Sequence, residues 1–152
     1  MTVTTEYAKR QCRWWRLSFS AVEKEILKHA DGIHSQSDSR TCRKDVLRLL
    51  KEDLATFYEN NQRVSKSICS YYIKTIVLHL WEEPCKSWAD YDLLQRYVDG
   101  LQRTLDCLEV KKIEHYFIKG ENLLDEKEIS EENLKKIKAY FRNKLTHYCS
   151  YL

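Results

Sequence analysis

Glycine and proline are rare in this 152-residue sequence, which contains three Gly and a single Pro, Pro84. Sheets of short strands need many turn residues, so this scarcity argues against an all-β chain and favours helices. No stretch approaches the ~20 consecutive apolar residues of a membrane-spanning helix. Residues 1–16 lack the apolar core of a secretory signal peptide. We therefore predict a globular chain without a membrane partner.

Closely spaced cysteines are absent as well. The six Cys residues include no C-x-x-C pair. Without a secretory context, we predict reduced thiols in a cytosolic or nuclear protein. Positive charge is concentrated early in the chain, because residues 1–51 hold eleven Lys and Arg against six Asp and Glu. This excess is compatible with phosphate-bearing partners but does not require nucleic acid.

Hydrophobic periodicity predicts an all-α fold, a compact bundle of about five helices. We expect an extended arm over residues 1–17 and a single helical domain over residues 18–152. A chain of this length buries roughly 70% of its unfolded surface, enough for a core without a metal or disulfide. Gly100, inside an expected helix, indicates a close helix contact. The expected helices cover residues 21–29, 41–59, 65–82, 89–108 and 130–148, and Ser130 opens the last of them. The one-sided apolar stripe of the second helix consists of Val46, Leu47, Leu50, Leu54, Phe57 and Tyr58.

The first motif surrounds an expected helix start with polar side chains. A Ser20–Glu23 capping box follows Arg16, whose guanidinium can donate two hydrogen bonds to a base edge or a phosphate. The start of a helix adds backbone N–H groups, so this segment can accept a nucleotide. The alternative is a helix cap with a salt-bridged arginine.

The second motif is Ser70-Tyr71-Tyr72-Ile73-Lys74-Thr75. On a helix, Tyr71 and Lys74 share a face, as do Ser70 and Lys74. An aromatic ring that stacks on a base, beside a cation for phosphate, is a plausible nucleotide platform. The alternative is a tyrosine packed half in the core with a lysine stem alongside.

Four strings in this order carry a family resemblance. They are the run from Trp15 to Lys24 and residues 42–45, 70–75 and 116–118 with 122–123. Over about residues 13–124 the chain resembles the cyclic GMP-AMP synthase (cGAS) and male-abnormal-twenty-one (Mab) family. The resemblance implies a C-terminal helical lobe of HhH/H2TH-like type, which packs against a separate nucleotidyltransferase lobe.

The resemblance also implies which residues meet a nucleotide. Arg16 matches the arginine that contacts the base, and Tyr71 matches the base-stacking tyrosine across a shared cleft. Lys51 matches a phosphate-facing lysine. The other implied nucleotide-binding positions are Ser18, Ser20, Glu23, Ser70 and Lys74.

The chain departs from the family pattern at its metal sites. Active relatives hold two magnesium ions on a carboxylate triad near a Gly-Ser turn, and this sequence contains no Gly-Ser pair. We therefore assign no catalytic residue, and we expect magnesium only with a catalytic lobe. The zinc thumb of the DNA-sensing branch needs four ligands. Here only His29, His34 and Cys42 are candidates, so zinc is not expected.

The resemblance predicts the nucleotide-binding helical half of a cGAS/Mab-like nucleotidyltransferase, inactive alone and related to innate immune sensors. Its ligands would be ATP, GTP, another NTP or a cyclic dinucleotide, and its partner a catalytic lobe. An alternative is a protein-interaction module with a vestigial pocket, which binds through apolar side chains around Trp14, Trp15 and Tyr71. A third possibility is electrostatic binding of RNA or DNA by residues 9–51. We expect the basic residues near Lys135 to form a solvated face, and His79 and His115 to be packed or capping.

Overall fold

The computed structural model describes residues 21–28, 41–124 and 129–152. The chain divides into two compact units, Met1–Ser39 and Arg40–Leu152. In the first unit, residues 21–28 form a helix. Across the described residues the fold is all-α, as predicted, and its β-type pairing is limited to two isolated bridges. No helix in these ranges is long and apolar enough to cross a membrane.

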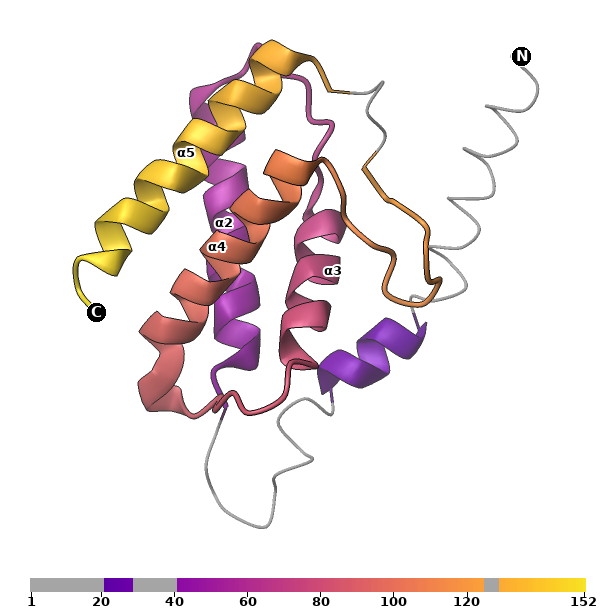
Figure 1. The fold of residues 1–152 in the computed structure, drawn as a ribbon, viewed down its shortest axis with the longest axis vertical. Helices are drawn as coiled ribbons and strands as arrows, with labels where there is room; N and C mark the ends of the chain where they lie inside the picture. The colour runs from indigo at the N-terminus through magenta and orange to yellow at the C-terminus, as the bar shows by residue number, and fades with distance from the viewer. Residues whose placement is uncertain (1–20, 29–40, 125–128) are drawn as a thin grey trace. The chain divides into compact units, whose positions relative to one another are not determined.

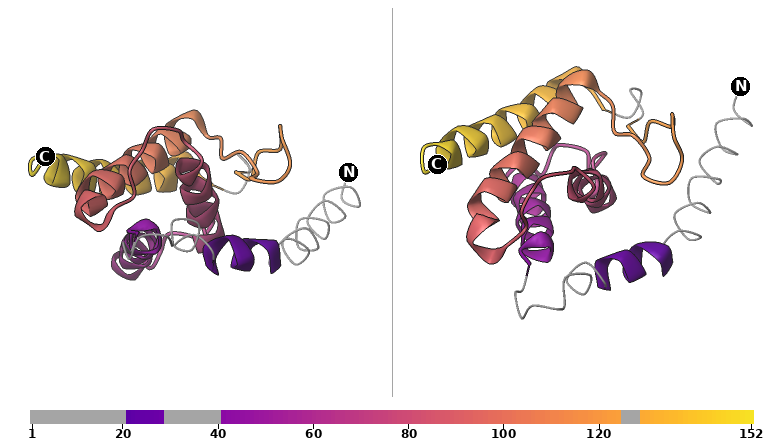
Figure 2. Two further views of the ribbon diagram at one scale, coloured as in Figure 1. Left: turned by 90° about the horizontal axis from the view of Figure 1, so that it is seen from below. Right: turned by 60° about the horizontal axis from the view of Figure 1, so that its bottom comes forward.

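The second unit is a bundle in which α4 packs against each of the other three long helices (Figures 1 and 2). α2 also packs against α3. The order is α2 (Arg43–Asn60), α3 (Ser70–Trp81), the 3-10 helix η1 (Asp90–Asp92), α4 (Leu93–Val110) and α5 (Glu131–Cys149).

The apolar stripe of α2 forms much of the core, as its 3.6-residue period indicates. All six apolar positions expected to face inward are buried: Val46, Leu47, Leu50, Leu54, Phe57 and Tyr58. α4 approaches this stripe closely at Gly100. A Cβ atom added to Gly100 would lie 2.7 Å from Leu50 Cδ1. The expected close helix contact at Gly100 is therefore confirmed, and Leu50 is its partner.

The start of α3 differs from the prediction, because the helix begins at Ser70 rather than near Ser65. The Tyr58 hydroxyl donates to the Ile68 carbonyl (2.8 Å) and accepts from the Ile68 N–H (3.1 Å). Both backbone groups of Ile68 are therefore bonded to a side chain of α2 instead of to a helical turn. Periodicity within one segment cannot reveal a contact made by a distant side chain.

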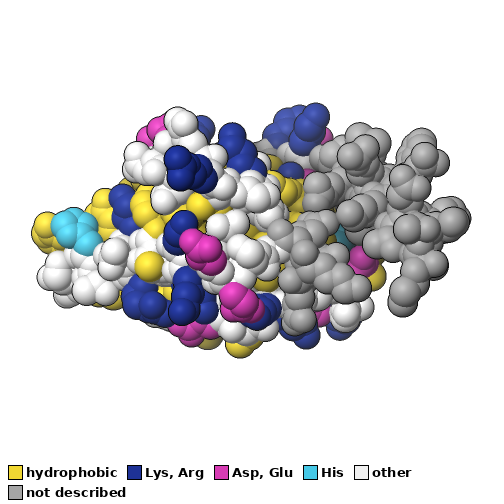
Figure 3. Space-filling model, turned by 90° about the horizontal axis from the view of Figure 1, so that it is seen from above, with side chains coloured by type: hydrophobic (Ala, Val, Ile, Leu, Met, Phe, Trp, Pro, Cys, Tyr) yellow, Lys and Arg dark blue, Asp and Glu magenta, His cyan; other side chains and the backbone are white. Residues whose placement is uncertain are grey.

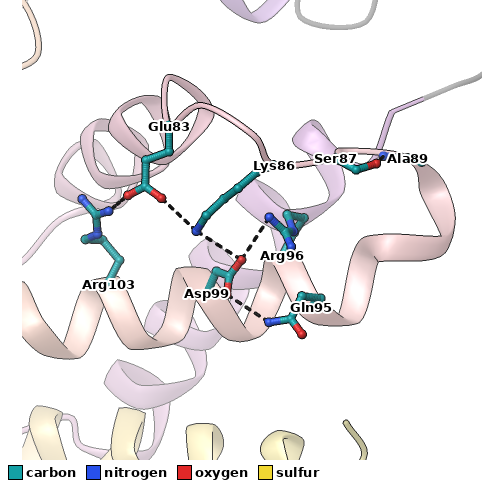
Figure 4. A network of polar contacts seen from close by, with 8 residues as sticks. All are labelled: Glu83, Lys86, Ser87, Ala89, Gln95, Arg96, Asp99 and Arg103. Carbon is teal, nitrogen blue, oxygen red and sulfur yellow. Dashed lines mark hydrogen bonds and ion pairs between the residues drawn. The ribbon is translucent and has the colours of Figure 1, made fainter.

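Ion pairs attach the connection after α3 to the surface of α4 (Figure 4). Lys86 Nζ lies 2.8 Å from Glu83 Oε2 and 3.4 Å from Asp99 Oδ2. Arg96 also pairs with Asp99, and Arg103 pairs with Glu83. Charges of alternating sign thus connect this loop to two turns of α4.

Asn122 organises the segment between α4 and α5. Its Oδ1 accepts from the N–H groups of Ile113 (2.8 Å) and Leu124 (3.0 Å), and its Nδ2 donates to the Lys111 carbonyl (2.9 Å). Gly120, with φ of +82°, supplies the left-handed turn. These bonds and this turn take the place of regular secondary structure over residues 111–124.

Ser130 caps α5, as the sequence predicts, and accepts from the Asn133 N–H (3.2 Å). We expect Ser130→Ala to lower the free energy of unfolding by about 1 kcal/mol, because the acceptor is lost. Chemical denaturation would measure the loss. Ser130→Asn retains an acceptor and should stay close to the wild-type chain. Equal destabilisation by both variants would contradict a capping role.

Candidate functional site

Tyr71 and Lys74 form a ring-and-cation pair near the start of α3. Lys74 Nζ lies 5.4 Å from the centre of the Tyr71 ring, within the range of a cation–π contact. The Thr75 hydroxyl donates to the Tyr71 carbonyl (3.0 Å), inside the same helical turn. Tyr71 and Lys74 are half-buried, whereas Tyr72 is buried in the core. Helical spacing therefore places both side chains on one face of α3, as predicted, and the half-buried Tyr71 also fits the alternative of a tyrosine packed partly in the core.

A second lysine reaches the same region from α2. Burial lowers the pKa of Lys51, and the positive charge of Lys74 lowers it further. The two ammonium groups thus lie within electrostatic range of each other, on two helices that pack together. Like charges repel each other, and a phosphate that contacts both ammonium groups would reduce this repulsion. Lys51, Tyr71 and Lys74 together constitute the candidate site, which we call the Lys–Tyr–Lys site.

The other predicted nucleotide-binding residues fall into three groups. Ser70 is the exposed first residue of α3, one turn before Lys74. Glu23 belongs to the helix of the first unit and is buried. Arg16, Ser18 and Ser20 lie outside the described residues. The convergence of Arg16 with Tyr71 on one cleft therefore stays a prediction.

The cysteine and histidine residues considered for zinc are not gathered in the described part of the chain. No three His, Cys, Asp or Glu side chains there form a group that could hold a metal ion. Cys42 is buried at the start of α2, and burial raises the pKa of its thiol to about 11. His29 and His34 lie outside the described residues.

His79 and His115 both hold the segment after α4. His79 Nε2 lies 2.8 Å from the Glu114 carbonyl oxygen, at hydrogen-bond distance. His115 is buried, and its Nδ1 accepts from the N–H groups of Phe117 (3.0 Å) and Ile118 (3.1 Å). These contacts account for both rings as structural groups.

Basic residues of α5 pair with carboxylates from three different helices. Lys136 Nζ lies 3.3 Å from Glu132, Arg142 Nη2 lies 3.0 Å from Glu109, and Lys144 Nζ lies 3.6 Å from Asp53. In Figure 3, Lys and Arg side chains are interspersed with Asp and Glu over the coloured part of the face. This mixture favours a surface of mixed charge over a continuous basic patch on that face.

One polar cluster was missed by the sequence analysis. Asp53 is buried on α2 and accepts a hydrogen bond from the hydroxyl of Tyr97 on α4. A signal was present, since Asp53 interrupts the apolar stripe between Leu50 and Leu54. A carboxylate at a core position needs a partner. The partner could not be identified before the helix packing was known.

Comparison with known proteins agrees with this architecture. Residues 42–146 match the family model described as the Mab-21 protein HhH/H2TH-like domain. The chain is similar to a cyclic GMP-AMP synthase of Mus musculus, with 37% identity covering 85% of the chain and 27% of that protein. A cyclic GMP-AMP synthase-like receptor of Magallana gigas is 31% identical, covering 72% of the chain and 18% of the receptor.

A third relative has a name of a different kind. An inositol 1,4,5-trisphosphate receptor-interacting protein of Danio rerio is 32% identical, covering 68% of the chain and 19% of that protein. The chain spans about a quarter or less of the length of these three relatives. Because the family model matches more than half of the residues and the identity to the Mus musculus synthase extends over most of the chain, the chain belongs to the cGAS/Mab-21 family and contains its C-terminal HhH/H2TH-like helical domain.

Proposed function

We propose that this chain is the nucleotide-binding helical half of a cGAS-like nucleotidyltransferase. The observation that carries the proposal is the contact at the Lys–Tyr–Lys site between Lys74 Nζ and the Tyr71 ring, whose centre lies 5.4 Å away. The lowered pKa of Lys51, to which the charge of Lys74 contributes, supports the assignment of Lys51 to the same site. The similarity to cyclic GMP-AMP synthases supports it. The proposed setting is the cytosol or nucleus, in innate immune sensing.

The chemistry of the Lys–Tyr–Lys site suits a nucleotide. The Tyr71 ring offers a face on which a purine base can stack. The ammonium groups of Lys51 and Lys74 can pair with phosphate oxygens, and a phosphate would reduce the repulsion between them. We propose that Arg16, with its polar neighbours, completes the contacts to the base. The proposed ligands are ATP, GTP or a cyclic dinucleotide.

The transfer reaction itself is proposed to need a second lobe. In active relatives, the resemblance assigns two magnesium ions to a carboxylate triad on that lobe. Among the described residues, no cluster of three or more Asp, Glu, His or Cys side chains could hold a metal ion. The proposed task of this chain is therefore to hold base and phosphate, not to activate the attacking hydroxyl.

Isothermal titration with ATP, GTP and a cyclic dinucleotide tests the proposal. We expect Tyr71→Ala to weaken binding roughly 10- to 100-fold, because base stacking on the ring is lost. Lys74→Gln should also weaken binding, and this loss should shrink as salt is raised because screening already reduces the attraction of Lys74 for phosphate.

A matched control uses an aromatic residue away from the Lys–Tyr–Lys site. Tyr91, in η1, is 87% exposed, and Tyr91→Ala should leave nucleotide affinity unchanged. Unchanged affinity in an Arg16→Ala, Tyr71→Ala double variant would refute nucleotide binding at this site. Circular dichroism of each variant separates lost binding from lost folding.

A second candidate function is a protein-interaction module of the same family. The similarity to a receptor-interacting protein of Danio rerio favours it, since that name denotes association rather than synthesis. In this case, the surface around Tyr71 would bind a protein. Light scattering distinguishes the candidates, because an uncovered apolar surface promotes association at high concentration. A clean monomer that binds nucleotides would exclude the module.

A further inference from the structure

α5 is docked in two different ways along its length. Its three buried side chains, Leu134, Ile137 and Phe141, all lie within residues 131–141, which we call the first half of the helix, residues 142–149 being the second. Over residues 142–149, no side chain is buried. Full burial therefore ends at Phe141, and the last two turns are held by half-buried side chains, which are Lys144, Leu145 and Tyr148.

A buried carboxylate of α2 contacts this part of α5. Asp53 of α2 is 7% exposed and accepts a hydrogen bond from Tyr97 of α4. Its other oxygen, Oδ1, lies 3.6 Å from Lys144 Nζ of α5. Three helices therefore meet at one buried negative charge, and Lys144 is the contribution of α5.

Aromatic rings surround the lysine of this cluster. Lys144 Nζ lies 5.8 Å from the ring centre of Tyr140 and 5.9 Å from that of Tyr148. The Tyr148 ring also makes an edge contact with Tyr97, with centres 5.1 Å apart. The second half of α5 thus docks through Lys144 and Tyr148 on Asp53 and Tyr97, in addition to the exposed Arg142–Glu109 ion pair at its start.

The two ends of the ion pair are not equivalent. The side chain of Lys144 is 33% exposed and can turn toward water, whereas that of Asp53 is only 10% exposed. Burial raises the pKa of Asp53, while the Tyr97 hydrogen bond and the Lys144 charge lower it and the nearby charge of Glu52 raises it. The ionised carboxylate is thus costly in the folded chain. Removing its cation should harm docking more than removing the carboxylate.

We propose that Lys144 is a charge-dependent latch: its ammonium compensates the buried Asp53 carboxylate and keeps the second half of α5 docked. Neutralising Lys144 releases residues 142–149, while residues 131–141 stay in place on their apolar contacts. The groups that set this balance are Glu52 and Asp53 on α2, Tyr97 on α4, and Tyr140, Lys144 and Tyr148 on α5. Local opening of this kind leaves the rest of the bundle folded.

The pH dependence follows from what surrounds the Asp53 carboxyl. In the wild-type chain, undocking exposes this carboxyl, which lowers its pKa, and removes the Lys144 charge, which raises it. In Lys144→Gln only the exposure remains, so docking of this variant is favoured when the carboxyl is protonated, in acid. Because Lys144→Gln removes the compensating cation, the defect of this variant should be large at neutral pH and disappear in acid.

Amide hydrogen exchange of the 152-residue chain, read by mass spectrometry and corrected for intrinsic rates, tests the latch. In Lys144→Gln, protection of residues 142–149 should fall about tenfold or more, with residues 131–141 unchanged. Asp53→Asn should change protection little, because the amide can still accept from Tyr97 and Lys144 can turn to solvent. The double variant should recover most of the protection lost in Lys144→Gln.

The control is Lys136→Gln, on the same helix, because Lys136 pairs with the exposed Glu132. It should leave both halves of α5 protected. If the Asp53 variants fail to fold, exchange of Lys144→Gln from about pH 8 to about pH 4 tests the same coupling. The latch is disproved if Lys144→Gln behaves like Lys136→Gln, if protection falls equally in both halves, or if neither the double variant nor acid restores it.

Discussion

Replacing Phe141 by alanine is expected to lower the free energy of unfolding by about 3–5 kcal/mol. The Phe141 side chain is 0% exposed and is one of only three buried side chains on α5. Its removal would leave a cavity where α5 meets the bundle, next to the ring of Tyr140, whose centre lies 5.5 Å away. Domains of this size are stable by about 5–15 kcal/mol, so the variant should be marginal. Urea denaturation measures the change.

Tyr91→Ala is the matched control for this loss, since it also deletes an aromatic ring. The Tyr91 side chain is 87% exposed, so the expected change in unfolding free energy is within about 0.5 kcal/mol. Similar losses in the two variants would show that α5 is not anchored by Phe141. A loss in Phe141→Ala with undiminished helicity would indicate that the bundle core survives while α5 detaches.

Leu50→Ala is expected to lower the free energy of unfolding by about 2–5 kcal/mol, because Leu50 of α2 is fully buried where α2 meets α4. Gly100→Ala alone should raise the free energy of unfolding only slightly or lower it. Its new Cβ would lie 2.7 Å from Leu50 Cδ1, and the resulting strain opposes the gain of about 1 kcal/mol in helix propensity. In the Leu50→Ala background the strain is gone, so Gly100→Ala should become stabilising.

The measurement is a double-mutant cycle by chemical denaturation. We expect a favourable interaction energy of about 1 kcal/mol or more between the two alanines, since the new methyl group partly fills the cavity. Additive effects would mean that α2 and α4 adjust independently at this contact. Gly100→Ser offers a check, because its hydroxyl would enter the same apolar space and should stabilise less.

The sequence predicts the helices well because their signals are local. The stripe through Leu50 and Phe57, the cap at Ser130 and the small residue at Gly100 all lie within one segment and are confirmed. The predicted start of α3 was wrong, because the Tyr58 hydroxyl of α2 binds both backbone groups of Ile68 and keeps that residue out of the helix. Local patterns thus determine which segments are helical, and tertiary contacts determine where those segments begin.

At the candidate site, too, local patterns predict some features and tertiary contacts determine the others. The contact between Tyr71 and Lys74 was predicted from helical spacing and is confirmed. Only the packing of α2 on α3 brings Lys51 to them, and the family resemblance, not the local pattern, singled it out. Asp53 was overlooked because its partners, Tyr97 and Lys144, lie far along the chain. Buried polar clusters of this kind depend on the three-dimensional arrangement of several helices.

The late start of α3 has an electrostatic consequence for Tyr71 and Lys74. Because the Tyr58 hydroxyl holds Ile68 outside the helix, Ser70 is the first helical residue. The aligned peptide dipoles of a helix leave about half a positive charge at its amino-terminal end. Long helical side chains lean toward that end. Because α3 begins at Ser70, the positive end of its dipole lies close to Lys74. The hydroxyl of Tyr58 on α2 therefore adds to the positive potential around Lys74 by setting where α3 starts.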